Sequence, residues 1–325
     1  MSKYLVTGAA GFIGARVVDL LMESGHEVIG IDNLANTYDV RLKEWRLARL
    51  QRSNLFTFIR EDIGGRSIID KLVPICTDVN GLINLAARAG VRSSVQDPWI
   101  YYNTNVTGSL NMLELCRTLG ISKFVQASSS SVYGENNPMP YLEDANTDFP
   151  MQPYAASKKA SEVLCYTYHY LHNIDVTVLR YFTVYGPAAR PDMAMFRFTQ
   201  WIAEGKPVKM NGDGEQSRGF TYVDDIARGT IQALKPVGYE IINLGGHEVI
   251  TMNNLIHLFE TKLGKKANLV YEPRHMADAI GNWASSEKAK NLLGWSAQVK
   301  LDEGVSRLVD WYKLERTWAS QVITG

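Results

Sequence analysis

Apolar residues along the first 182 positions alternate between short runs of strand length and longer stretches with helical periodicity. This pattern predicts strands and helices in turn, at 3–7, 15–24, 27–32, 40–50, 56–61, 67–75, 81–87, 99–119, 123–128, 154–172 and 175–182. Such alternation favours a parallel sheet with helices on both faces and right-handed crossovers. The predicted class is therefore α/β, with a doubly wound parallel sheet (a Rossmann fold).

The pattern changes after Phe182, where glycine and proline interrupt it at Gly186-Pro187 and again between Gly205 and Gly214. We interpret this change as the start of a smaller, mixed α/β lobe that binds the substrate. The predicted domains are residues 1–182, which would bind a nucleotide, and residues 183–325. A helix at 224–234 and a strand at 239–244 are expected to bring residues 221–250 back to the first domain.

Composition narrows the possible partners and the compartment. The 325 residues include 34 Lys and Arg against 34 Asp and Glu, so the net charge gives no argument for nucleic acid or a membrane surface. There is no apolar run of membrane-spanning length and no signal-peptide pattern. Three scattered cysteines suit a reducing compartment, and we expect a cytoplasmic protein. His169 and His172 lie three apart without further ligands nearby, so no metal site is predicted.

A glycine motif follows the first predicted strand directly. Gly8, Gly11 and Gly14 are spaced GxxGxxG, with Phe12 and Ile13 expected to contact the cofactor, and a helical pattern follows through Val17, Val18, Leu20 and Leu21. Strand, glycine turn and helix together are typical of dinucleotide binding, because the glycines let the backbone approach a pyrophosphate. The helix N-terminus then offers N–H groups and a partial positive charge to the phosphates. A tight turn without a ligand is the alternative.

Asp32 and Asn33 follow the second predicted strand. An acid at this position can bind both hydroxyls of an adenosine ribose and repels a 2′-phosphate. Residues 34–38 bring no Arg or Lys to accept such a phosphate, which favours NAD over NADP. A strand-end cap is the alternative role for Asp32. Further cofactor contacts are expected after the next strands, at Asp62, Ile63, Leu85, Ala86 and Ala87.

Tyr154 and Lys158 stand four residues apart in a predicted helix, about 25 residues after a serine run. That spacing puts a phenol and an ammonium one turn apart on one face. A nearby cation lowers the pKa of a phenol, so Tyr154 is predicted to ionise near neutral pH and to take a proton from an alcohol. Such a base is what alcohol oxidation coupled to hydride transfer requires.

Motifs spread over essentially the whole chain resemble the extended short-chain dehydrogenase/reductase family. They are Gly8-Ala-Ala-Gly-Phe-Ile-Gly14, Ser128-Ser-Ser-Ser-Val-Tyr-Gly134, Tyr154-Ala-Ala-Ser-Lys158 and Arg218-Gly-Phe-Thr-Tyr-Val-Asp-Asp225. Within that family the chain is similar to nucleotide-sugar 4-epimerases, and most similar to those acting on UDP-glucuronate. Signatures for the latter are Arg88-Ala-Gly-Val-Arg92, Arg180-Tyr-Phe-Thr-Val-Tyr-Gly-Pro187 and Ala188-Ala-Arg-Pro-Asp-Met193.

The resemblance implies roles for individual residues. Tyr154 would be the base, and Lys158 would lower its pKa and hold the nicotinamide ribose. Ser129 would hydrogen-bond the reacting sugar oxygen, with Ser131 as the competing choice. Tyr181 joins the implied set of cofactor-binding residues.

The substrate diphosphate would meet two arginines, Arg218 and Arg274, because a guanidinium donates paired hydrogen bonds to phosphate. His275 could equally fill the second position. The chain has Gly219 where the family usually has Asp after the arginine, which removes a carboxylate that would orient it.

An acidic sugar needs donors and positive charge around its carboxylate, because a buried unpaired carboxylate is costly. The implied set is Ser130, Ser131, Thr183 and Arg190, although Arg190 could instead pair with Asp192 within its loop.

The expected activity is therefore inversion at C4 of a UDP-sugar through a 4-keto intermediate with bound NAD, converting UDP-glucuronate to UDP-galacturonate. Epimerisation of neutral UDP-hexoses, decarboxylation of UDP-glucuronate and a non-enzymatic NAD-binding role are the alternatives. A homodimer is implied by the family. Apolar residues such as Leu113, Val163 and Leu171 could form its helical interface, but packing within one subunit would explain the same pattern.

Overall fold

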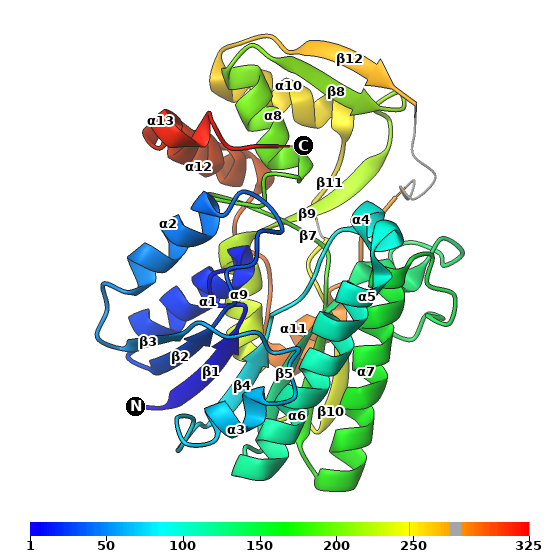
Figure 1. The fold of residues 1–325 in the computed structure, drawn as a ribbon. Coiled ribbons are helices and arrows are strands. Elements are labelled where there is room, and N and C mark those ends of the chain that lie inside the picture. Colours follow the sequence, from blue (N-terminus) through cyan, green and yellow to red (C-terminus); the bar gives the residue numbers. More distant parts are fainter. Residues whose placement is uncertain (247, 274–280, 325) are drawn as a thin grey trace.

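The computed structural model describes residues 1–246, 248–273 and 281–324. A large sheet with helices on both faces forms one part of the molecule, and a group of helices with two small sheets stands over one end of it (Figure 1). The α/β class with a parallel Rossmann-like sheet is confirmed. The division into domains 1–182 and 183–325 stays a prediction.

The large sheet has seven parallel strands in the order β10-β6-β5-β4-β1-β2-β3. Thr7 at the end of β1 pairs with Ile31 on one side and Asn84 on the other, so these strands end at one edge. The strands are β1 (Lys3–Thr7), β2 (Glu27–Ile31), β3 (Phe56–Ile59), β4 (Gly81–Asn84), β5 (Lys123–Ser129), β6 (Asp175–Tyr181) and β10 (Tyr239–Leu244).

The chain passes from the large sheet to the smaller sheets after β6. A single residue separates Tyr181, the last residue of β6, from Thr183, where β7 starts. One is a three-stranded sheet, β11-β9-β7, and the other is the parallel pair β12-β8. Their strands are β7 (Thr183–Tyr185), β8 (Pro207–Asn211), β9 (Ser217–Tyr222), β11 (Glu248–Thr251) and β12 (Asn268–Glu272).

The helices bury their apolar faces in three main hydrophobic clusters, one on each face of the large sheet and one under α8, α10 and α12. They are α1 (Phe12–Glu23), α2 (Arg41–Leu50), α3 (Ile68–Leu72), α4 (Val91–Gln96), α5 (Pro98–Tyr101), α6 (Gly108–Leu119), α7 (Pro153–His172), α8 (Ala194–Ala203), α9 (Val223–Gln232), α10 (Met252–Leu263), α11 (Glu287–Leu293), α12 (Leu301–Leu314) and α13 (Arg316–Ala319). None in the described part of the chain combines the length and apolarity of a membrane span.

Local chemistry explains several helix ends. Proline at the first position starts α7, where its missing N–H costs nothing. The left-handed residues Gly120 and Asn173 end α6 and α7. Two expected helices differ from the structure: the one at 67–75 is a single short helix, 68–72, and the one at 99–119 is divided by a π-helical segment, Tyr102–Thr107.

Candidate active site

The glycine turn between β1 and α1 is closed too tightly for side chains. Gly8 has φ of +69°, and a Cβ there would lie 2.8 Å from the backbone nitrogen of Ala86. A Cβ on Gly14 would lie 2.1 Å from the carbonyl oxygen of Gly8. α1 begins at Phe12, within the glycine motif, so the N–H groups of its first turn, which have no acceptor within the helix, belong to the same segment. The residues present therefore fit a dinucleotide pyrophosphate, as the motif predicts.

Asp32 lies buried at the end of β2 and is held by three donors. It accepts hydrogen bonds from the N–H of Ala10 (3.2 Å) and of Leu34 (2.8 Å). The ammonium of Lys43, on α2, also lies 3.2 Å from its Oδ1. Lys43 lies beyond residues 34–38, where no cation was found in the sequence, so a positive charge beside Asp32 was not expected. The negative charge of Asp32 is therefore compensated by the buried ammonium of Lys43.

The other expected cofactor positions gather at the same edge. Asn33 Nδ2 donates to Asp62 Oδ2 at 2.7 Å, which joins the ends of β2 and β3. Ile63 is buried beside them. Two N–H groups after β4 donate to Thr7 at the end of β1: that of Leu85 to the carbonyl oxygen at 3.3 Å, and that of Ala86 to Oγ1 at 3.1 Å. Ala87 follows in the same turn.

Ser129, Tyr154 and Lys158 come together where β5 ends against α7. Ser129 is the last residue of β5, and its hydroxyl donates to Ser131 Oγ at 3.2 Å. Tyr154 lies in the first turn of α7, near enough to Ser129 for that hydroxyl to lower the pKa of the phenol. Lys158 is buried one turn later and donates to the carbonyl oxygen of Ala127 at 2.9 Å.

The electrostatics of Tyr154 differ from the expectation. Burial raises the pKa of its phenol above the usual value, while the neighbouring hydroxyl of Ser129 and the charge of Arg190 lower it. The ammonium of Lys158 donates to the carbonyl oxygen of Ala127 at the end of β5, and its expected action on the phenol stays a prediction. Burial also lowers the pKa of Lys158, to about 8.

Arg190 is paired with Asp192 through two of its three guanidinium nitrogens. Nε donates to Oδ1 at 3.1 Å and Nη2 to Oδ2 at 2.6 Å, so the pairing within the loop left open by the sequence does form. Arg190 nevertheless lies close enough to Tyr154 for its charge to act on the phenol. Ser130 is buried beside Ser129 and accepts a hydrogen bond from Asn282 Nδ2 at 3.0 Å.

Thr183 and Arg218 belong to neighbouring strands of the three-stranded sheet. Thr183 pairs with Phe220 in the register of β7 and β9, two residues from Arg218. Glycine is needed at position 219, between Arg218 and Phe220 on β9, because a Cβ there would lie 2.4 Å from the carbonyl oxygen of Gly246. The carboxylate usual at this position could not fit. Arg274 and the alternative His275 lie outside the described residues.

Tyr181 ends β6 with its hydroxyl engaged elsewhere. The hydroxyl is hydrogen-bonded to Thr230 Oγ1 on α9 at 2.8 Å, and burial raises the pKa of the phenol. Only its backbone or ring could therefore face a cofactor at this edge.

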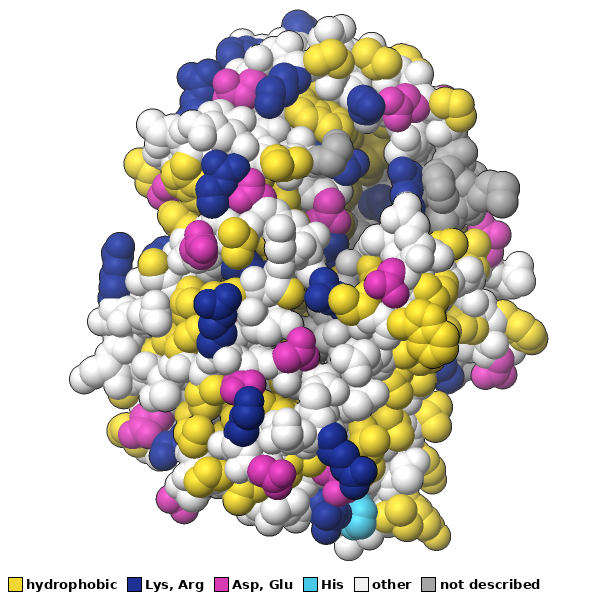
Figure 2. Space-filling model, in the orientation of Figure 1, with side chains coloured by type: hydrophobic (Ala, Val, Ile, Leu, Met, Phe, Trp, Pro, Cys, Tyr) yellow, Lys and Arg dark blue, Asp and Glu magenta, His cyan; other side chains and the backbone are white. Residues whose placement is uncertain are grey.

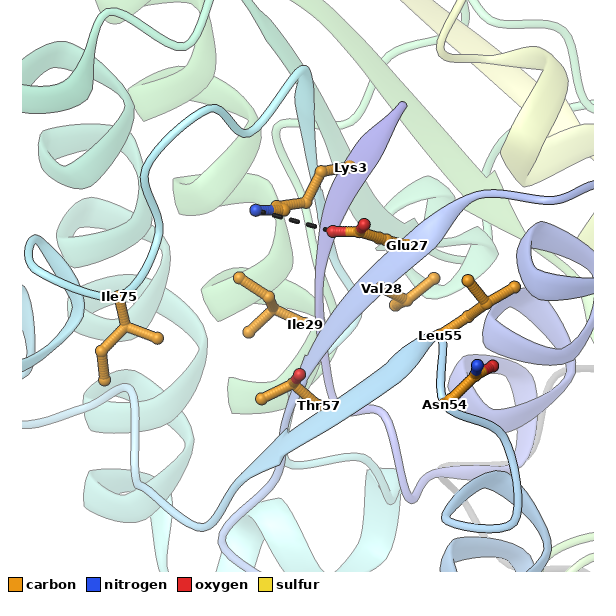
Figure 3. A pocket seen from close by; sticks show the side chains of 8 residues that line it. All are labelled: Lys3, Glu27, Val28, Ile29, Asn54, Leu55, Thr57 and Ile75. Atoms are coloured by element: carbon orange, nitrogen blue, oxygen red, sulfur yellow. Dashed lines mark ion pairs between the residues drawn. The ribbon is translucent and has the colours of Figure 1, made fainter. Parts of the chain in front are cut away.

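Figure 2 shows a hollow between the two parts of the molecule, with Lys and Arg side chains along it. A second hollow lies at the opposite end of the sheet, where β1 and β2 begin (Figure 3). Lys3 and Glu27, paired at 3.6 Å, form part of its wall. Ligands of such sheets bind at the carboxyl ends of the strands, so we assign the site to the first hollow.

Comparisons with known proteins agree with this geometry. Residues 4–245 match the model of the NAD dependent epimerase/dehydratase family. The chain belongs to this family.

A "UDP-glucuronate 4-epimerase" of Thermodesulfobacterium geofontis is 51% identical over 96% of this chain and 97% of its own length. A crystal structure of "UDP-Glucuronic acid 4-epimerase from Bacillus cereus in complex with UDP-Glucuronic acid and NAD" has a TM-score of 0.90 at 37% identity, covering 96% of this chain and 99% of that one. A Thermotoga maritima UDP-glucose 4-epimerase with UDP-glucose has a TM-score of 0.89 at 32% identity, covering 97% and 99%.

Two buried polar residues at the site, Asn105 and Arg46, were not predicted from the sequence. Asn105, in the π-helical segment, donates to Ser157 Oγ at 2.9 Å and exchanges hydrogen bonds with the backbone of Arg88. Arg46, on α2, donates to the carbonyl oxygens of Ala10 (2.9 Å) and Ala188 (2.6 Å). A polar residue on the apolar face of a predicted helix was the available signal in each case.

Proposed function

We propose that this protein is an NAD-dependent UDP-glucuronate 4-epimerase that interconverts UDP-glucuronate and UDP-galacturonate. The observation that carries the proposal is the meeting of Ser129, Tyr154 and Lys158 at the same sheet edge as the glycine turn, with Arg190 beside the phenol. The relatives named for this activity support it, since they match over nearly the whole chain.

In the proposed cycle Tyr154 removes the proton from the C4 hydroxyl of the sugar and later returns it. Ser129 hydrogen-bonds the same sugar oxygen and orients the phenol. NAD, when bound, supplies the hydride acceptor and donor at C4. Lys158, deep in the fold, would hold the nicotinamide ribose, and Asp32 the adenosine ribose. A positioned base contributes about 10²- to 10⁴-fold to the rate, and the remainder comes from placement of the reactants.

The phenol needs a cation to ionise, because burial raises the pKa of Tyr154. Arg190 is the described cation whose charge lowers it. We propose that the same guanidinium binds the substrate carboxylate, with hydroxyls of Ser130, Ser131 and Thr183 completing the site. Holding the carboxylate out of line with the C4 carbonyl would slow loss of carbon dioxide from the 4-keto sugar. Arg218, and Arg274 beyond the described residues, would bind the diphosphate.

NMR analysis of UDP-glucuronate incubated with the purified protein tests the proposal. We expect UDP-galacturonate to accumulate, with deuterium at C4 retained in the product. Tyr154→Phe should lower turnover at least 100-fold while NAD still binds. Unchanged C4 configuration for UDP-glucuronate, or turnover that survives Tyr154→Phe, would overturn the assignment. Arg190→Ala should weaken UDP-glucuronate far more than UDP-glucose.

We also propose a homodimer formed by α7 and the helices beside it. Val163, Tyr170 and Leu171 on α7 are 56%, 73% and 61% exposed, whereas Leu113 on α6 is fully buried in the subunit core. Figure 2 shows hydrophobic side chains gathered along the edge where α5 and α7 lie in Figure 1. An apolar helical face of this kind fits a second copy of itself about a two-fold axis.

Sedimentation analysis tests the dimer. Tyr170→Glu should produce monomers. Tyr271→Glu, on a tyrosine of β12 that is 57% exposed, should leave the assembly unchanged. Identical mass for the wild type and Tyr170→Glu would argue against this interface.

A cytoplasmic location is proposed as well, supported by Cys76, Cys116 and Cys165 being free and buried. The two predicted domains, with residues 221–250 in the first, are proposed as the units between which the substrate binds. The pairing of β10 with β6 in the large sheet supports the return of that segment.

A further inference from the structure

A fully buried carboxylate lies on α7, the helix that carries the proposed catalytic residues Tyr154 and Lys158. Glu162 is one helical turn beyond Lys158 on α7 and is 1% exposed. Its Oε1 accepts hydrogen bonds from Ser128 Oγ at 2.6 Å and from Arg180 Nε at 2.9 Å, and its Oε2 from Arg180 Nη2 at 2.8 Å. The carboxylate therefore joins α7 to the neighbouring strands β5 and β6.

Stability alone gives a weak account of this cluster. Desolvating two charges costs about as much as their attraction returns, and apolar side chains of similar volume often serve a fold equally well. Arg180 is itself engaged on other sides, stacked 4.8 Å from the ring centre of Tyr133 and donating to the carbonyl oxygen of Glu143 at 3.2 Å. The negative charge of Glu162 therefore matters for its other neighbours as well.

Lys158 is the neighbour whose charge depends on it. The lysine is 3% exposed, and the hydrogen bond that its ammonium donates goes to a neutral carbonyl oxygen, that of Ala127. Burial lowers the pKa of Lys158 to about 8, and the charge of Glu162 is the larger of the two influences that raise it, ahead of Cys165. Without that carboxylate, the pKa of Lys158 would fall further below its usual value.

The other groups packed around Glu162 do not replace it. Burial raises the pKa of Cys165, on α7, so that this thiol stays neutral. Tyr239, on β10, donates its hydroxyl to the backbone oxygen of Glu162, and burial raises its pKa too. Ser128 is uncharged, and Arg180 is positive. Glu162 is thus the anion that faces Lys158 from these elements.

We propose that Glu162 is a positioning residue for the reaction, acting as the buried counter-ion that keeps Lys158 protonated. It also fixes the end of β5: Glu162 holds Ser128, Lys158 holds the carbonyl of Ala127, and Ser129 follows immediately. One carboxylate thereby maintains the lysine charge and the place of the serine. This inference rests on the proposed function of Lys158.

Glu162→Gln tests it, since the amide keeps the shape and removes the charge. NMR titration of the nucleotide-free protein labelled with ¹³C at lysine Cε would follow Lys158 directly, with Lys158→Arg to assign its signal. We expect the midpoint of Lys158 to fall by about one pH unit. In turnover of UDP-glucuronate, the alkaline limb of kcat/KM should move down by the same amount.

Glu162→Gln leaves the buried guanidinium of Arg180 without its carboxylate, so a second variant is needed in case this one does not fold. Glu162→Gln/Arg180→Gln removes both charges and should show a smaller shift in the same direction, because loss of the guanidinium partly offsets loss of the carboxylate. Asp175→Asn is the matched control, because Asp175 pairs with Lys123 across the same two strands at their other end; it should leave both midpoints unchanged. An unmoved Lys158 midpoint in the folded single or double variant would refute the inference. Because the titration needs no turnover, absence of epimerase activity in the wild type would instead refute the proposed function.

Discussion

Replacing Asp32 with alanine should turn the adenosine end of the site toward NADP. The wild-type carboxylate would repel a 2′-phosphate, but Lys43 lies 3.2 Å from it and carries the opposite charge. Removing the acid eliminates the repulsion and releases the ammonium. The same change removes the acceptor for ribose hydroxyls, so binding of NAD should weaken while binding of NADP improves.

The size of the shift follows from charge and distance. Two unit charges about 4 Å apart interact by about 4 kcal/mol at the effective dielectric of a protein surface. Allowing for solvent screening leaves about 2 kcal/mol, which corresponds to roughly a 30-fold change in the affinity ratio of NADP to NAD. Stability should fall at the same time, because a buried ion pair that loses one partner costs about 3–5 kcal/mol.

Calorimetric titration of nucleotide-free protein with each dinucleotide measures the ratio, and thermal unfolding measures the cost. Lys43→Met keeps the apolar stem without the charge and supplies the control. The double variant Asp32→Ala/Lys43→Met should recover stability and lose the part of the NADP gain that the released ammonium supplies. A folded Asp32→Ala protein with an unchanged ratio, or a double variant with the full gain, would refute the reasoning.

Three further changes test other parts of the site. Gly14→Ala should lower NAD affinity at least tenfold in a binding titration, because its Cβ would lie 2.1 Å from a backbone oxygen of Gly8 and force the turn open; unchanged affinity would contradict the assigned pyrophosphate site. Asp192→Asn should tighten UDP-glucuronate about threefold and leave UDP-glucose unchanged, since it frees Arg190; equal effects on both sugars would count against the carboxylate role. Tyr133→Phe should destabilise the fold by about 1–3 kcal/mol in denaturant unfolding, because the buried phenol donates to an amide oxygen at 2.6 Å; no loss would show that this bond contributes little.

Much of the fold could be predicted because its signals are local. Strand length, helical periodicity and the glycine spacing are properties of adjacent residues, and the carboxyl ends of parallel strands meet at one edge. That is why Gly8, Asp32 and Ser129, far apart in the sequence, were expected together. Tyr154 and Lys158 were found by the one-turn spacing of a helix.

What the sequence could not predict depends on distant side chains and on burial. Lys43 reaches Asp32 only through the packing of α2 beside β2. The pKa of Tyr154 rises because the surrounding fold removes water, which spacing along a helix does not report. The same holds for the π-helical segment, whose Asn105 is fixed by contacts with residues on two other segments.

Three of the ion pairs that the described residues form near this edge differ in burial, and the difference indicates different roles. Side chains of Asp32–Lys43 and Glu162–Arg180 are at most 9% exposed, whereas those of Arg190 and Asp192 are 25% and 41% exposed. Separating a buried pair costs about 3–5 kcal/mol, but an exposed pair contributes only about 0–1 kcal/mol. Arg190 can therefore exchange Asp192 for a ligand carboxylate at small cost, while the buried pairs keep their partners. A site that binds an acidic sugar and also keeps its catalytic base in place needs both an exposed pair that can exchange its partner and buried pairs that cannot.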